Sequence, residues 1–102
     1  MIEYKKTASA LGETDWINLA TTSVNASDDY TIVVQFSSDY SALVDVEFAI
    51  ESDLTDPTII CHDVLNNLET TIASTVMTPM SAIRLNVKSY KGGTITLKLL
   101  QA

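Results

Sequence analysis

The tripeptide Cys61-His62-Asp63 places three residue types of catalytic chemistry next to one another. A nucleophile works only within hydrogen-bond distance of its base, and neighbouring residues of an extended chain point to opposite faces. His62 is also the only histidine, so the chain has no second imidazole for a metal site. We therefore expect a buried cysteine beside a loop histidine, and a protein that is not an enzyme.

Aspartate side chains are the next candidates for chemistry, because carboxylate oxygens bind calcium. The candidates are Asp28, Asp29, Asp39, Asp45, Asp53 and Asp56. A calcium loop needs six to eight converging oxygens, and the chain has no D-x-D-x-D-G pattern. Asp53 with Asp56 stays open as a calcium pair, against the simpler interpretation that these residues start turns and remain solvated. We expect no metal and no cofactor.

Aromatic residues form the third candidate group, as a platform on which sugar rings could stack. They are Trp16, Tyr4, Tyr30, Tyr40 and Tyr90. Their spacing does not put them on one face. Trp16 is expected instead to anchor the core or an interface.

The composition restricts the classes of function. The chain has 102 residues, enough for one domain, with a net charge of -7. An acidic chain is poorly suited to nucleic acid or to an anionic membrane surface, because both attract Lys and Arg. A single cysteine excludes an intrachain disulfide, and the sequence shows neither a signal peptide nor an apolar run of the roughly 18 residues that span a bilayer. We expect synthesis in a reducing cytoplasm.

Several segments alternate apolar and polar residues, which is typical of half-buried strands. The clearest are residues 82–88 and 94–100, which are joined through Gly92-Gly93. Because glycine accepts the positive φ values of tight turns, residues 82–101 are predicted to form a β-hairpin. Residues 30–36 and 43–51, joined by turn formers, are predicted to form a second hairpin, with Ile50 on its apolar face.

The remaining segments complete an all-β pattern. Short strands are predicted at residues 16–19, 58–61 and 71–76, and one helical turn near 63–68 stays open. Seven or so short strands separated by turns indicate a single-domain antiparallel β-sandwich of jelly-roll-like type over residues 1–102.

Residues 1–12 break the strand pattern and hold Lys5 and Lys6, a third of the basic residues. Three interpretations remain open for this segment: a strand, an N-terminal arm that reaches out of the domain, or a frayed terminus. As an arm it would bring positive charge to a neighbour. Tyr4, Lys5, Lys6 and Trp16 are the candidate partner contacts.

The C-terminal half resembles small virion proteins of tailed bacteriophages. The resemblance rests on His62-Asp63-Val64-Leu65, on the run from Pro79 to Val87 (PMSAIRLNV), and on the ending from Ser89 to Gln101 (SYKGGTITLKLLQ). It covers roughly residues 60–101 and implies a β-sandwich that sits on or in the particle.

This resemblance implies a capsid decoration (cement) protein that binds the major capsid protein in the virion. We expect a homo-oligomer, with a trimer favoured, because symmetry would multiply weak contacts. Two alternatives stay open: a carbohydrate-binding adhesion module, and a head–tail or tail ring component.

Overall fold

The computed structural model describes residues 2–19, 30–37, 41–51, 54–76 and 80–101. Its elements, in chain order, are β1 (Ile2–Ala8), β2 (Gly12–Glu13), β3 (Ile17–Asn18), β4 (Tyr30–Phe36), β5 (Ser41–Ala49), β6 (Ile59–Ile60), the 3-10 turn η1 (Asp63–Leu65), β7 (Ile72–Val76), β8 (Ala82–Gly92) and β9 (Ile95–Gln101). Within these residues no helix has the length and apolar character needed to cross a membrane.

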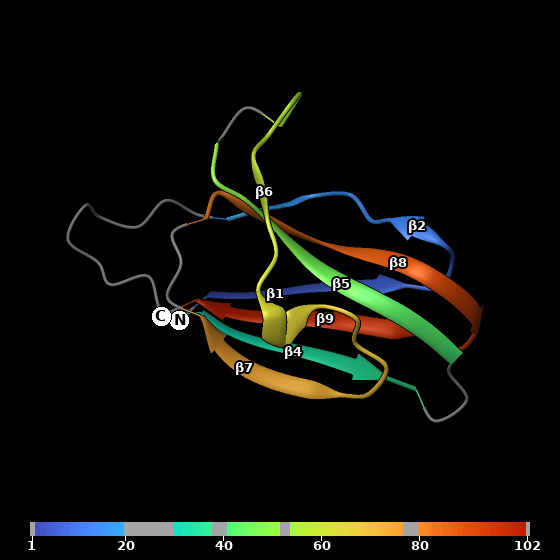
Figure 1. The fold of residues 1–102 in the computed structure, drawn as a ribbon. Helices are drawn as coiled ribbons and strands as arrows, with labels where there is room; N and C mark the ends of the chain where they lie inside the picture. The colour runs from blue at the N-terminus through green and yellow to red at the C-terminus, as the bar shows by residue number, and fades with distance from the viewer. Residues whose placement is uncertain (1, 20–29, 38–40, 52–53, 77–79, 102) are drawn as a thin grey trace.

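The strands form two antiparallel sheets that pack face to face (Figure 1). Sheet A has the order β1-β9-β4-β7, and sheet B has the order β2-β8-β5-β6 with β3 also paired to β8. Successive strands mostly alternate between the sheets, as they do in a jelly roll. The predicted all-β sandwich is therefore confirmed.

Both predicted hairpins are wrong, because β8 and β9 lie in different sheets, as do β4 and β5. β8 pairs with β5, and β9 lies between β1 and β4. Alternation reports which side chains of a strand face the core. The alternating pattern is the same whether the next strand pairs with the first in one sheet or lies in the sheet on the other side of the core.

The chain between β8 and β9 crosses from one sheet to the other. Gly92 and Gly93 have φ values of 155° and 84°, a region that residues with a Cβ rarely adopt. The Tyr90 hydroxyl donates a hydrogen bond to the Gly93 carbonyl at 2.6 Å. Ser37 Oγ accepts one from the Thr94 amide at 2.9 Å, which ties this crossing to the end of β4. The two glycines thus form a turn, as expected, but this turn connects the two sheets and is not a hairpin within one sheet.

The core consists of the inward-facing side chains of both sheets. Its fully buried members include Ile32, Val34, Val44, Val46, Phe48, Leu65, Ile83, Leu85, Ile95, Leu97 and Leu99. The predicted apolar faces of β4, β5, β8 and β9 are inward as expected. Ile50 is the exception: β5 ends at Ala49, and Ile50 is 46% exposed.

Two ambiguous segments are resolved. η1 confirms one helical turn, and Leu65 and Leu68 from this region are buried. Residues 2–8 are a strand, paired with β9 along its whole length from Ile2–Gln101 to Ala8–Ile95. The arm interpretation is therefore wrong for this part of the N-terminal segment.

Candidate interaction surface

The four predicted contact residues do not form one patch. Tyr4 and Lys6 lie opposite Leu99 and Leu97, which are buried, so both share the inward side of β1. Lys5 lies on the outward side. Trp16 lies in the segment between β2 and β3, two strands of the other sheet.

Trp16 and Arg84 are part of a polar network on the outer face of sheet B. The Arg84 guanidinium carbon lies 4.2 Å from the centre of the Trp16 ring, a cation–π contact. Arg84 Nε donates to Glu47 Oε1 at 2.7 Å, and its Nη1 lies 3.1 Å from Glu13 Oε2. Asn86 donates to the other Glu47 oxygen at 3.1 Å. Trp16 is thus committed to a contact within the domain.

A second cluster continues this network along β5 and β8. Lys88 Nζ lies 3.0 Å from Asp45 Oδ2 and donates to Asn67 Oδ1. Asp45 Oδ1 accepts a hydrogen bond from the backbone N–H of Asn67 at 2.7 Å. The charges on the outer face of sheet B therefore largely satisfy one another, which leaves them less available to a partner.

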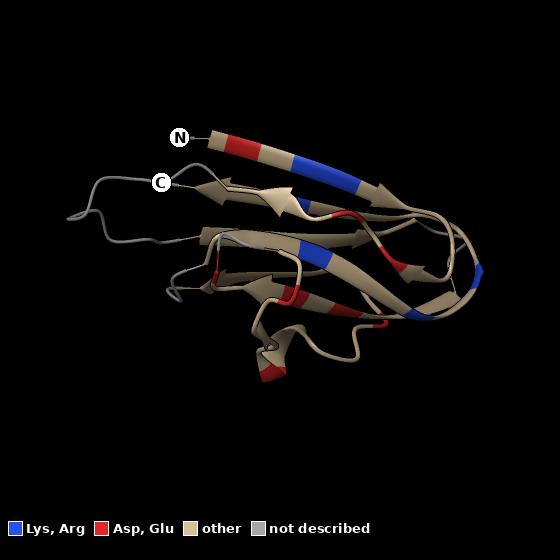
Figure 2. Cartoon of the chain, turned by 90° about the horizontal axis from the view of Figure 1, so that it is seen from above, with Lys and Arg blue, Asp and Glu red and all other residues tan. Residues whose placement is uncertain are grey.

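The outer face of sheet A is different, because few of its side chains carry charge. Its outward positions on β1, β9, β4 and β7, inferred from strand register, are Glu3, Lys5, Thr7, Thr96, Lys98, Leu100, Thr31, Val33, Gln35, Ala73 and Thr75. Figure 2 shows one acidic and one basic band on the N-terminal strand, β1. Neutral polar and small apolar side chains dock with little desolvation cost.

Lys5 and Lys98 lie directly opposite each other on β1 and β9. Like charges in this position destabilise a sheet. Neither makes an ion pair with any residue that the structure describes, whereas Lys6, Arg84 and Lys88 each do. A hollow of about 370 Å³ lies here, lined by Glu3, Tyr4, Lys5, Lys98 and Leu100. Sequence reasoning found Lys5 but missed Lys98, because only the strand register brings the two together.

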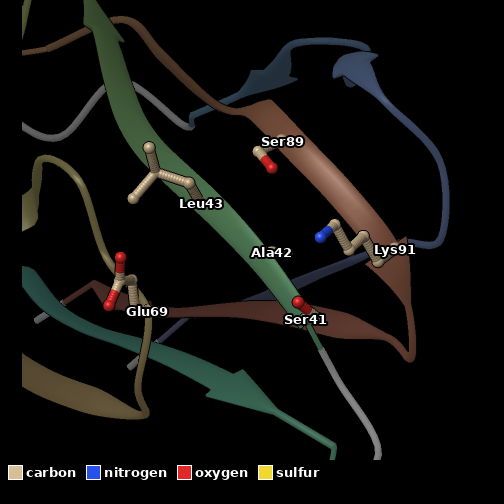
Figure 3. A pocket seen from close by; sticks show the side chains of 6 residues that line it. All are labelled: Ser41, Ala42, Leu43, Glu69, Ser89 and Lys91. Carbon is tan, nitrogen blue, oxygen red and sulfur yellow. The ribbon is translucent and has the colours of Figure 1, made fainter.

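A second hollow, of about 480 Å³, lies at the end of sheet B, where register shifts interrupt the pairing of β5 with β8. It is lined by Ser41, Ala42, Leu43, Glu69, Ser89 and Lys91. Figure 3 shows Glu69 and Lys91 on opposite sides of it. The polar groups that line it are the Ser41 and Ser89 hydroxyls, the Glu69 carboxylate and the Lys91 ammonium.

The Cys61-His62-Asp63 segment does not provide an activated thiol. Cys61 is exposed, so the expectation of a buried cysteine is wrong. Partial desolvation, and then the Glu47 and Asp45 carboxylates, raise the pKa of its thiol, which disfavours the nucleophilic thiolate. The His62 ring packs on Phe48, with 5.2 Å between the ring centres.

The other candidate sites are not assembled by the described residues. No three His, Cys, Asp or Glu side chains among them gather to hold a metal ion. Of the predicted calcium pair, Asp56 is exposed and Asp53 lies outside the described residues. Tyr4, Tyr30 and Tyr90 contribute to the core and Trp16 lies on the outer face of sheet B, while Tyr40 is not described. The four described rings therefore form no shared platform.

Comparisons with known proteins found no matching family model, no matching curated protein and no matching solved structure. The similarity to bacteriophage virion proteins therefore stays a prediction from the sequence.

Proposed function

We propose that this chain is a non-catalytic docking domain of the capsid-decoration type, which binds shell subunits through the outer face of sheet A. The observation that supports the proposal is the contrast between the two outer faces. Sheet B pairs its charges internally, whereas sheet A presents a nearly neutral surface with two opposed lysines, Lys5 and Lys98. An acidic group on a partner would relieve their repulsion.

The fold is consistent with this role, because jelly rolls form capsid and lectin domains. A fold does not define a function, so the proposal depends on the surface and on the sequence resemblance. The aromatic residues give the carbohydrate alternative less support, since a sugar platform needs open rings on one face.

Two lysines make a direct test of the docking face. The variant Lys5→Gln/Lys98→Gln should bind shells that lack the protein more weakly than the native chain does, and native binding should weaken as salt rises. Lys91→Glu is the matched control, because it changes the net charge by the same amount from sheet B. Equal binding by both variants would contradict a docking role for sheet A.

Stoichiometry in purified virions tests the class of protein. A decoration protein should be present in amounts comparable to the major capsid protein, as measured by quantitative mass spectrometry. An amount matching a single ring would favour the tail or connector alternative. Absence from the particle, together with binding on a glycan array, would favour the adhesion module.

A further inference from the structure

The two sheets have four edges, and their protection against pairing with other chains is unequal. Exposed edge strands present free N–H and C=O groups, and proteins usually guard them with charges, inward-pointing lysines or very short strands. On sheet B the edges are β2 with β3 on one side and β6 on the other, and each of these strands has only two residues. Both edges of sheet B are therefore short.

β1 forms one edge of sheet A and carries charge. Its seven residues include Glu3, Lys5 and Lys6. Lys6 points toward the inner side, where its ammonium lies 3.9 Å from Asp15. An inward charge at an edge disfavours the addition of another strand.

β7 forms the opposite edge of sheet A and has none of these features. Its five residues, from Ile72 to Val76, include no charge, no proline and no glycine. It pairs with β4 on one side, and no other segment that the structure describes pairs with its second side. Ala73 and Thr75 are exposed on its outward face. Such a strand is a template for pairing.

We propose that β7 pairs antiparallel with β7 of a second copy of this chain, across a two-fold axis near Ser74. A two-fold contact uses the same patch twice, so the patch must complement itself. With the axis at Ser74, Ile72 lies opposite Val76 of the other copy and Ala73 lies opposite its Thr75. All these pairs are neutral. Ile, Val and Thr are also residue types that favour strands. The charges that give the chain its net -7 lie elsewhere, so the contact brings no like charges into opposition.

This dimer would join two four-stranded sheets into one of eight, with the guarded β1 strands at its ends. The inference goes beyond the proposed function and does not depend on it. The trimer expected from the sequence would need a different contact, because a two-fold pairing of β7 closes at two copies.

The test uses native mass spectrometry and light scattering on the full chain over a range of micromolar concentrations. The native chain should be dimeric at the upper end. Ala73→Lys/Thr75→Lys opposes like charges across the axis and should weaken dimerisation about tenfold or more. Leu11→Lys/Asn18→Lys adds the same charge at exposed sites, one before β2 and one in β3 of the other sheet, and should leave the dimer intact.

A charge-reversed partner makes the test specific to this pairing. Ala73→Glu/Thr75→Glu alone should also be monomeric, while an equal mixture with the lysine variant should form a heterodimer. Circular dichroism should show that each variant is folded. A native chain that is monomeric throughout, a native trimer, or a lysine variant that dimerises as well as the native chain would each overturn the proposal.

Discussion

Arg84 and Glu47 lie directly opposite each other on β8 and β5, with 2.7 Å between Arg84 Nε and Glu47 Oε1. Their side chains are only 13% and 11% exposed, so water screens the pair weakly. Removing one partner leaves the other charge largely buried and without this ion pair, which costs more than the pair itself contributes.

Arg84→Ala should therefore lower the free energy of unfolding by about 2 kcal/mol, through the loss of the Glu47 and Glu13 contacts and of packing on Trp16. Urea denaturation followed by tryptophan fluorescence measures this. Asp15→Ala is the control, since Asp15 is 97% exposed and lies 3.9 Å from Lys6, and it should change stability by less than about 0.5 kcal/mol. Equal changes in the free energy of unfolding would show that the Arg84 contacts stabilise the domain no more than the exposed Lys6–Asp15 pair does.

Removing residues 1–10 should prevent cooperative folding, because β9 would lose one of its two partner strands along seven residues. Near-ultraviolet circular dichroism and thermal unfolding measure this. Two point variants test whether the packing of β1 matters in a chain of unchanged length. Ala8→Asp buries a charge and should cost several kcal/mol, whereas Thr7→Asp on the outward side should be tolerated. A truncated chain that unfolds like the native one would contradict the role of β1.

Leu97→Asp should unfold the domain, because Leu97 is fully buried and its carboxylate replacement would have no partner in the core. The expected loss is several kcal/mol. Thr96→Asp is the matched control on the same strand, since Thr96 faces outward next to Thr7. One-dimensional proton NMR should show a dispersed spectrum for Thr96→Asp and a collapsed one for Leu97→Asp.

The Cys61 thiol should react with iodoacetamide more slowly in the folded domain than in the urea-unfolded chain at the same pH. Its pKa is raised in the fold, chiefly by desolvation and then by the Glu47 and Asp45 carboxylates, so less thiolate is present. By linkage, this thiol slightly destabilises the fold as the pH rises through its unfolded and then its folded pKa. A folded chain that reacts faster than the unfolded one would point to an activated cysteine. Separately, the variant Cys61→Ser should leave dimerisation unchanged.

The sequence predicts which residues are inside this domain better than it predicts which strands are neighbours. Side-chain alternation marked the buried face of β9 correctly, because burial acts on each residue of a strand separately. Pairing depends on the register between distant segments. Gly92-Gly93 was therefore assigned to a hairpin, although it joins two sheets.

The same limit applies to the surface. Lys5 was a visible candidate because it stands out in its own segment, but its opposition to Lys98 depends on the pairing of the first strand with the last. The sequence also does not predict that β7 is an edge strand, because a short neutral strand has the same residue pattern at an edge and in the middle of a sheet.

The position of β9 has a consequence for how the domain reaches its native state. β9 is the last strand along the chain, yet it occupies an interior place in sheet A, between β1 and β4. Until it is in place, β1 has no pairing partner among the described strands, and β4 has only β7. Sheet A is thus completed by contacts distant in sequence, which predicts slow folding and leaves β1 and β4 open to pairing elsewhere until β9 is in place.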